Sequence, residues 1–260
     1  MVITRTQVSQ LGVKQSGIAL VAVLLVVAIA TIMVVAITRE QQVSIHLTRG
    51  FLSRGQAVQY ALGGEELARQ ILQEDHADGT NKDHLLESWA SPNLHFEFED
   101  GEVNLKITDL QGLLNVNSLS SENKSIQISR QRIINLLLSI GVDPYVVDRI
   151  QDWIDKDTSS RPGGLEDFDY LVFDMPYRAA NSIMQDISEL NLMGLEFETL
   201  QLISPFFSAL PDPSASININ TAPPSVLQAL SSELSADSAT LLTQRREEQA
   251  TGFDSVETFL

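Results

Sequence analysis

The longest uniform hydrophobic stretch runs from Ile18 to Ile37, 20 residues without a charge, a proline or a glycine. A helix of about 20 apolar residues is long enough to cross the hydrocarbon core of a bilayer. The residues before it include Arg5 and Lys14 but no acid, and basic residues beside a span stay on the cytoplasmic side. The pattern predicts a single-pass membrane protein with its N-terminus in the cytoplasm and the residues from about 40 onward outside, which in a bacterial cell means the periplasmic face of the inner membrane.

Apolar residues continue at spacings of three and four beyond the span, which predicts that the helix extends past the membrane. This stripe consists of Ala57, Val58, Ala61, Leu62, Ala68, Ile71 and Leu72. Gly50, Gly55, Gly63 and Gly64 interrupt it and would permit bends or close packing. The segment from Glu74 to Asn81, rich in Asp, His and Gly, is expected to end the helix.

Two short stretches, Leu94–Phe98 and Val103–Ile107, alternate apolar and polar residues. Asp100-Gly101 lies between them, and such a dipeptide between alternating runs is typical of a tight β-hairpin. A long helix followed by antiparallel strands predicts an α+β fold with the layout of a pilin-like domain.

Two later stretches share the order Asn-x-Asn-Ser/Thr, helix, short turn, helix. One begins at Asn115, has its first helix over Ile133–Ile140 and ends near Asp155; the other begins at Asn218 and ends near Glu248. Asn and Ser/Thr are favoured as helix N-caps, and Pro223-Pro224 suits the first turn of the second copy. The sequence therefore predicts a helical region built on two related repeats.

The second copy resembles the helix-hairpin-helix (SAM-like) motif of DNA-uptake and repair proteins, in which glycines let the backbone approach a phosphate. Here the hairpin Ser231–Ser235 has no glycine and carries Glu233 at its centre. The chain has a formal charge of -17, which becomes -19 when residues 1–17 are removed. Because phosphate binding depends on Lys and Arg, no nucleic-acid partner is expected, and a periplasmic DNA-uptake protein is the weaker alternative.

The most polar stretch lies between the two copies, where a Gly163-Gly164 turn separates two acidic groups. Carboxylates at alternate positions suit calcium, which takes six to eight oxygen ligands. The alternative is a solvated acidic loop. The candidate metal ligands are Asp152, Asp155, Asp157, Glu166, Asp167 and Asp169.

Catalytic chemistry has little support in the sequence. The four histidines lie scattered in the first half of the chain, no Ser/His/Asp arrangement is present, and the absence of cysteine excludes disulfides and thiolate metal sites. Asp155 and Asp157 could form the acid–base pair of an envelope glycosidase, but nothing marks a substrate cleft. We therefore expect a protein that is not an enzyme.

Three ordered motifs together resemble the general secretion pathway protein K family, the large minor pseudopilins of type II secretion. They are Gly17 directly before the apolar run at Ile18, the acidic segment Asp152–Asp157 with Arg161–Asp167, and the segment Ile217–Pro224. A cleaved secretory signal would have a shorter apolar core and a small-x-small site after it. A plain membrane anchor would leave the glycine before the span unexplained.

The resemblance implies a pilin-like core with a large helical domain inserted in its sheet, calcium bound by that domain, and cleavage after Gly17 by a prepilin peptidase. It implies assembly with other minor pseudopilins and the major pseudopilin on an inner-membrane secretion platform. The expected parts are a leader (1–17), a transmembrane helix (18–38), a pilin-like helix and first strands (39–112), an inserted helical domain with the acidic loop (113–216), and the second repeat (217–260).

The residue at the fifth position of the processed chain bears on where the subunit would sit. Most pilins carry a glutamate there, whereas this chain has Ala22. A buried carboxylate in a lipid-bound helix is costly without a partner, so its absence suits a subunit at the tip of the pseudopilus that initiates assembly. A type IV pilus minor pilin is the alternative. Family members usually continue beyond the second repeat into strands that finish the sheet, so the sequence is either shorter or a fragment.

Overall fold

The computed structural model describes residues 16–77, 82–92, 94–98, 101–249 and 252–253. The chain divides into two compact units, residues 1–63 and 64–260. The fold belongs to the α+β class, with a long N-terminal helix and short strands, as the sequence predicts.

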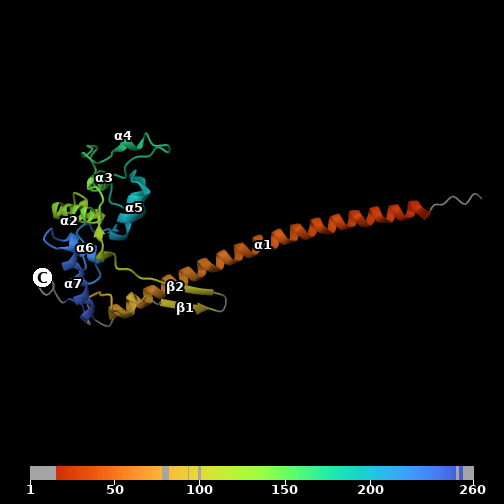
Figure 1. The fold of residues 1–260 in the computed structure, drawn as a ribbon, viewed down its shortest axis with the longest axis horizontal. Helices are drawn as coiled ribbons and strands as arrows, with labels where there is room; N and C mark the ends of the chain where they lie inside the picture. The colour runs from red at the N-terminus through yellow and green to blue at the C-terminus, as the bar shows by residue number, and fades with distance from the viewer. Residues whose placement is uncertain (1–15, 78–81, 93, 99–100, 250–251, 254–260) are drawn as a thin grey trace, which may run out of the picture. The chain divides into compact units, whose positions relative to one another are not determined.

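Helix α1 runs without interruption from Ser16 to Ala77 and is coloured red to yellow in Figure 1. It includes one stretch that is long and apolar enough to cross a membrane by length and composition. The glycines at positions 50, 55 and 63 do not end it. At Gly64 a Cβ would lie 3.0 Å from Cγ1 of Val103, so this glycine permits the close packing of a strand on the helix.

The predicted hairpin is confirmed, but its second strand lies two residues earlier than expected, so that Gly101 belongs to the strand and Ile107 does not. Strand β1 (Leu94–Phe98) pairs antiparallel with β2 (Gly101–Leu105), with Leu94 opposite Leu105 and Phe96 opposite Val103. These four side chains are half-buried, whereas the residues between them are exposed. The alternation thus gives the hairpin one covered face. Asp100 of the expected turn lies outside the described residues.

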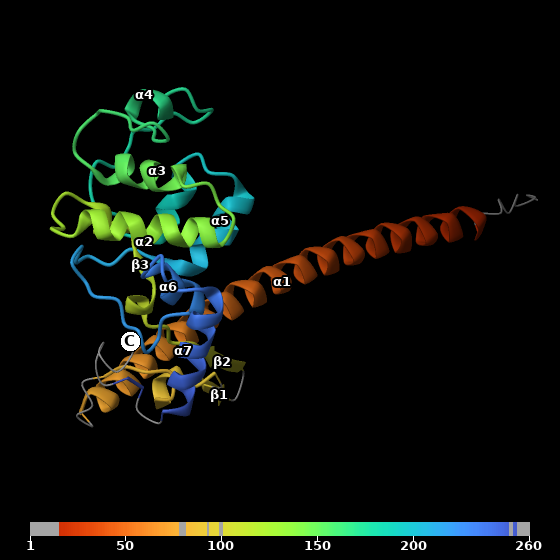
Figure 2. The same cartoon turned by 60° about the vertical axis from the view of Figure 1, so that its left-hand side comes forward.

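In the part of the chain that the structure describes, the helical region contains six α-helices, short 3₁₀ helices and a pair of two-residue strands. Helix α2 packs against both α3 and α6, and α6 packs against α7, so that α2 lies between α3 and α6 (Figure 2). Strands β3 and β4 pair in parallel. The bounds are β3 Leu114–Asn115, α2 Ile126–Ser139, α3 Tyr145–Ile154, α4 Asp167–Tyr170, α5 Phe197–Ile203, β4 Phe207–Ser208, α6 Pro224–Ala229 and α7 Ala236–Glu248.

One hydrophobic core holds this region together, from Leu114 at its start to Phe253 at its end. Its aromatic part centres on Tyr170, which is fully buried. The ring of Trp153 meets Tyr170 edge-on at 5.3 Å, and Tyr177 stacks on Tyr170 at 5.4 Å. The C-terminal end of α3 is therefore fixed against the segment that follows α4.

Helix α2 begins at Ile126, about two turns before the predicted start at Ile133. The prediction followed the apolar run and missed the polar first turns. Their polarity has a structural use, because the guanidinium of Arg130 donates to Gln151 at 2.6 Å and to Asp148 at 2.5 Å on α3. An ion pair between helices thus replaces apolar packing in this part of α2.

The expected asparagine N-caps are wrong for the long helices, because Ser125 precedes α2 and Pro223 precedes α6. Pro224 does occupy the first turn of α6, as predicted. Asn115 instead caps the 3₁₀ helix Val116–Leu119. The motif residues act mainly through contacts between loops that are distant in sequence.

Asn117 shows this role most clearly. Its side chain is fully buried, donates to the carbonyls of Met184 and Leu210, both at 2.9 Å, and accepts from the Met184 amide at 2.8 Å. At the corresponding position of the second copy, Asn220 bonds the backbone N–H and carbonyl of Phe253. Each copy therefore uses an amide side chain to fix a remote loop.

Candidate metal site

The acidic loop begins where α3 ends and returns to α4 through the Gly163-Gly164 turn. Asp155 is the C-cap of α3 and has an extended backbone. A Cβ on Gly164 would lie only 1.7 Å from Oδ2 of Asp152. The glycine lets the returning backbone approach α3 closely enough to bring Glu166, the N-cap of α4, back to the end of α3.

Asp152 is fully buried and bound by Arg161. Its Oδ2 accepts from the Arg161 amide at 2.9 Å, and its Oδ1 accepts from the Arg161 guanidinium. Burial raises the pKa of Asp152, and the hydrogen bonds from Arg161 oppose this. The same guanidinium reaches Oδ2 of Asp155 at 2.6 Å. Arg161 therefore supplies the counter-charge for Asp152, which needs no metal ion.

Three carboxylates remain grouped beside this pair, from Asp155, Asp157 and Glu166. One oxygen of each lies within 4.8 Å of the others. Both oxygens of Glu166 and Oδ1 of Asp155 are hidden from solvent and have no hydrogen-bond donor among the described residues. Burial, with the neighbouring aspartates, raises the pKa of Glu166 to about 7. Buried carboxylate oxygens without donors are what a bound cation would satisfy.

The remaining two predicted ligands are used by the protein itself. Asp167 accepts from the Ala179 amide at 3.1 Å and from Arg178 at 3.2 Å. Asp169 accepts from the Glu166 amide at 2.9 Å, which stabilises the first turn of α4. The structure thus brings together Asp155, Asp157 and Glu166, and gives other partners to Asp152, Asp167 and Asp169.

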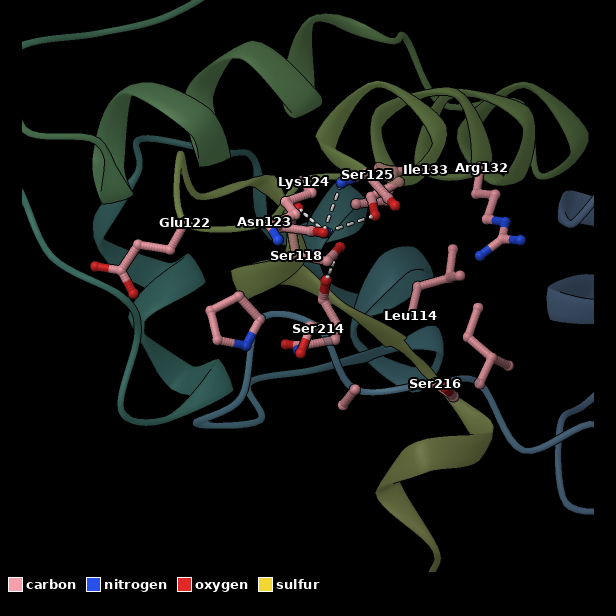
Figure 3. A pocket seen from close by; sticks show the side chains of 15 residues that line it. Leu114, Ser118, Glu122, Asn123, Lys124, Ser125, Arg132, Ile133, Ser214 and Ser216 are labelled. Carbon is pink, nitrogen blue, oxygen red and sulfur yellow. Dashed lines mark hydrogen bonds between the residues drawn. The ribbon is translucent and has the colours of Figure 1, made fainter.

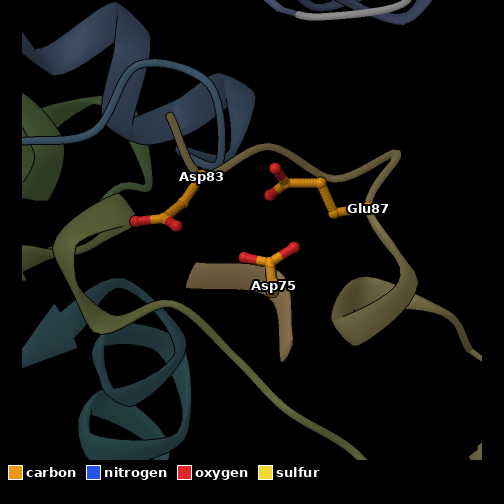
Figure 4. A group of neighbouring side chains, drawn as sticks. All are labelled: Asp75, Asp83 and Glu87. Carbon is orange, nitrogen blue, oxygen red and sulfur yellow. The ribbon is translucent and has the colours of Figure 1, made fainter. Parts of the chain in front are cut away.

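A second carboxylate group, which the sequence analysis missed, lies at the end of α1. Asp75, Asp83 and Glu87 offer oxygens within 4.8 Å of one another (Figure 4). Glu87 already accepts from Trp89 Nε1 at 2.7 Å and from the backbone amide of His84 at 2.8 Å. The available signal was the richness in Asp and His from Glu74 onward, from which the sequence analysis predicts only a helix end.

The processing site and the hairpin complete the sequence-predicted features. Gly17 and Ile18 lie in the first turn of α1, and the leader before Ser16 lies outside the described residues. In the hairpin of the second copy, the Glu233 amide donates to the Ser231 hydroxyl and the Leu234 amide to the Ser231 carbonyl. These two amides are used within the turn rather than offered to a phosphate.

Comparison with known proteins identifies the family. Family models described as type II secretion system (T2SS), protein K match residues 112–212 and 217–260. The type II secretion system protein K of Pseudomonas aeruginosa is 39% identical over 227 residues, covering 83% of this chain and 68% of that protein. The Klebsiella pneumoniae protein of the same name is 34% identical over 260 residues, covering 95% of this chain and 79% of its own.

A solved structure agrees with these matches. The chain resembles one in the GspK-GspI-GspJ complex of the enterotoxigenic Escherichia coli type 2 secretion system, with a TM-score of 0.71 and 30% identity. The likeness covers 82% of this chain and 76% of the other. This chain therefore belongs to the type II secretion system protein K family and is a minor pseudopilin of that system.

Proposed function

We propose that this subunit sits at the tip of the periplasmic pseudopilus, where it initiates assembly and supports export of proteins across the outer membrane. The apolar part of α1 anchors it in the inner membrane with the N-terminus in the cytoplasm. Its partners are other minor pseudopilins, the major pseudopilin, prepilin peptidase and the inner-membrane platform. Its role is structural rather than enzymatic.

The observation that carries this proposal is the likeness to the solved GspK-GspI-GspJ complex. That similarity covers 82% of the chain. The assembly named there supports counterparts of its two other subunits as direct partners of this chain. The small residue Ala22 agrees with the tip position, because a subunit with none above it has no terminal amine to neutralise.

The architecture assigned to this role is a pilin-like unit, formed by α1 with β1 and β2, that carries an inserted helical region. The pairs α2–α3 and α6–α7 correspond to its two helix-hairpin-helix-like repeats. The contacts with smaller pseudopilins are assigned to α1 between residues 57 and 72. Ala57, Val58, Ala61 and Leu62 support this assignment, since all four are exposed apolar or small side chains on a helix.

Single cysteines introduced at Ala57 and Ala61 are expected to cross-link to the two smaller minor pseudopilins in cells that carry the whole secretion system. The chain has no cysteine of its own, so each attachment point is unique. A cysteine at Leu241, an exposed position of α7, should capture neither. Efficient capture of a second copy of this chain along the fibre would show a repeating shaft subunit and would contradict the tip position.

Replacing Gly17 with Phe is expected to block removal of the leader. The side chain would occupy the position where the peptidase needs a small residue, directly before the span. Intact mass and N-terminal sequencing should give Ile18 as the first residue of the wild-type protein and Met1 for the variant. Ser16→Ala serves as the control and should be processed normally. A wild-type chain beginning at Met1 or near residue 40 would show that the prepilin assignment is wrong.

Calcium is assigned to the group formed by Asp155, Asp157 and Glu166. Oδ1 of Asp155, both oxygens of Glu166 and one oxygen of Asp157 can supply about four of the six to eight oxygens that calcium takes, and water can supply the rest. Zinc is less suited, because it prefers His and Cys ligands. The orphaned oxygens of Glu166 and Asp155 support this assignment, since a cation would remove the cost of leaving them buried without partners.

A further inference from the structure

A cavity of about 490 Å³ lies between the N-terminal half of α2, the segment from β3 to Ser118, and the loop Pro213–Ile217. It is separate from the acidic loop. Its floor includes the buried side chains of Leu114 and Ile133. Several serines also line it, among them Ser118 and Ser214 (Figure 3).

Arg132 at one end of this cavity has an unusual environment. The side chain is half-buried, and its Nε is hidden from solvent without a hydrogen-bond acceptor among the described residues. Burial lowers the pKa of Arg132, and no carboxylate counteracts it. A partly desolvated guanidinium without an acceptor is energetically costly, so an anion bound beside Arg132 would be stabilising.

The other buried or half-buried arginines of the described helical region have acceptors for their terminal nitrogens, although Nε of Arg149 and Nε of Arg246 also lack one. Arg130 pairs with Asp148. Arg149 and Arg246 each donate to two backbone carbonyls. Arg132 differs from these three described arginines because its neighbours supply neither a carboxylate nor a carbonyl acceptor.

The charges around the cavity favour an anion at the Arg132 end. Lys124 lines the same cavity and forms no ion pair with the described residues. Glu122 lies at the end opposite Arg132 (Figure 3), and its carboxylate is 3.6 Å from Nζ of Lys156. Half-buried Arg132 and exposed Lys124, neither of which forms an ion pair with a described residue, thus line a cavity in a chain whose net charge is -17.

We propose that this cavity binds a carboxylate side chain of a polypeptide segment, with Arg132 as its counter-ion. The planar guanidinium matches a carboxylate through two parallel hydrogen bonds. One arginine and one lysine are few for a polyphosphate or nucleic-acid ligand, which needs a cluster of cations. The volume and the apolar floor exceed what a lone carboxylate would use, so they suit the stem of an Asp or Glu and its neighbouring residues.

The full chain in detergent, labelled with ¹⁵N, is titrated with N-acetyl-glutamate amide while the backbone amides of Ser129 and Ser214 are followed by NMR. Both signals are expected to shift and saturate. The neutral glutamine analogue should bind about tenfold or more weakly, because it lacks the charge that strengthens these hydrogen bonds.

Arg132→Gln should weaken binding of the glutamate probe at least about tenfold. Arg245→Gln, an equal change of charge at an exposed site outside the cavity, should leave it unchanged. Arg132→Lys tests the same point with the positive charge kept, and an intermediate weakening is expected, because lysine lacks the planar fork. Equal binding by Arg132→Gln and the wild type would overturn the proposal. Tighter saturation by inorganic phosphate than by the glutamate probe would overturn the carboxylate assignment.

Discussion

Glu166→Gln is expected to make the metal-free protein more stable than the wild type at pH 8, by about 3 kcal/mol. Burial first, and then the charges of Asp152, Asp155 and Asp157, raises the pKa of Glu166 from 4.5 to about 7. Each unit of pKa shift corresponds to about 1.36 kcal/mol. Glutamine keeps the shape of the side chain but carries no charge, so the variant avoids this cost.

The sign of the pH dependence follows from the raised pKa of Glu166. Between pH 4.5 and about 7 the folded protein holds this proton more tightly than the unfolded chain does. The metal-free wild type should therefore lose stability as the pH rises through that window, and the loss should be complete above it. In Glu166→Gln residue 166 no longer titrates, so the free energy of unfolding should change less with pH than in the wild type.

Calcium should remove most of the difference in stability between the wild type and Glu166→Gln. At about 100 times its Kd, an ion that binds only the folded state adds roughly 2.7 kcal/mol. The wild type should gain this free energy of unfolding at pH 8, whereas the variant should gain little. Urea unfolding of the full chain in detergent, followed by tryptophan fluorescence with chelator or with calcium, measures both effects.

Asp167→Asn is the matched control for the calcium experiment. Its carboxylate bonds Arg178 and the Ala179 amide rather than the three-carboxylate group. The substitution should lower stability by a similar amount with and without calcium. If Asp167→Asn removed the calcium response while Glu166→Gln kept it, the ligand assignment would be wrong. If neither chelator nor calcium changed the unfolding curve of the wild type, the acidic loop would be only solvated.

The elements that were predictable from sequence are those whose pattern is local. The apolar run after Ile18, the alternation on either side of Asp100-Gly101 and the turn after α2 each depend on residues close in sequence. The parallel pair β3–β4 was not predictable, because each strand has only two residues and the partner lies far along the chain. The start of α2 was missed because Arg130 makes its first turns polar for a contact that only the tertiary structure reveals.

The metal ligands in the acidic loop were also only partly predictable from sequence. Residue spacing identified six carboxylates but could not show which of them the protein itself neutralises. Arg161 binds Asp152, and the Ala179 amide binds Asp167, across distances in sequence that no local pattern encodes. The carboxylate group of Asp75, Asp83 and Glu87 was missed for a related reason, since its members come from two segments whose proximity no local pattern encodes.

Asn117→Ala is expected to destabilise the helical region by about 3–6 kcal/mol. The substitution leaves without partners the buried N–H and C=O of Met184 and the part-buried C=O of Leu210. Each unsatisfied buried group costs about 1–3 kcal/mol, and the part-buried group costs less. Since a typical domain has a total stability of about 5–15 kcal/mol, this one amide accounts for a large share of it. Asn117→Asp should be at least as damaging, because it would place a charge against both carbonyls.

The control is Asn191→Ala, which removes an exposed side chain that bonds only the Ser188 carbonyl. Surface changes of this kind stay within about 0.5 kcal/mol. Asn220→Ala should fall between the two, because Asn220 bonds one residue, Phe253, where Asn117 bonds two separate loops. The shift in urea midpoint, followed by near-ultraviolet circular dichroism of Trp153 in its buried aromatic cluster, gives the order directly. If Asn117→Ala cost no more than Asn191→Ala, the hydrogen bonds of Asn117 would contribute nothing measurable to holding the loops at Met184 and Leu210.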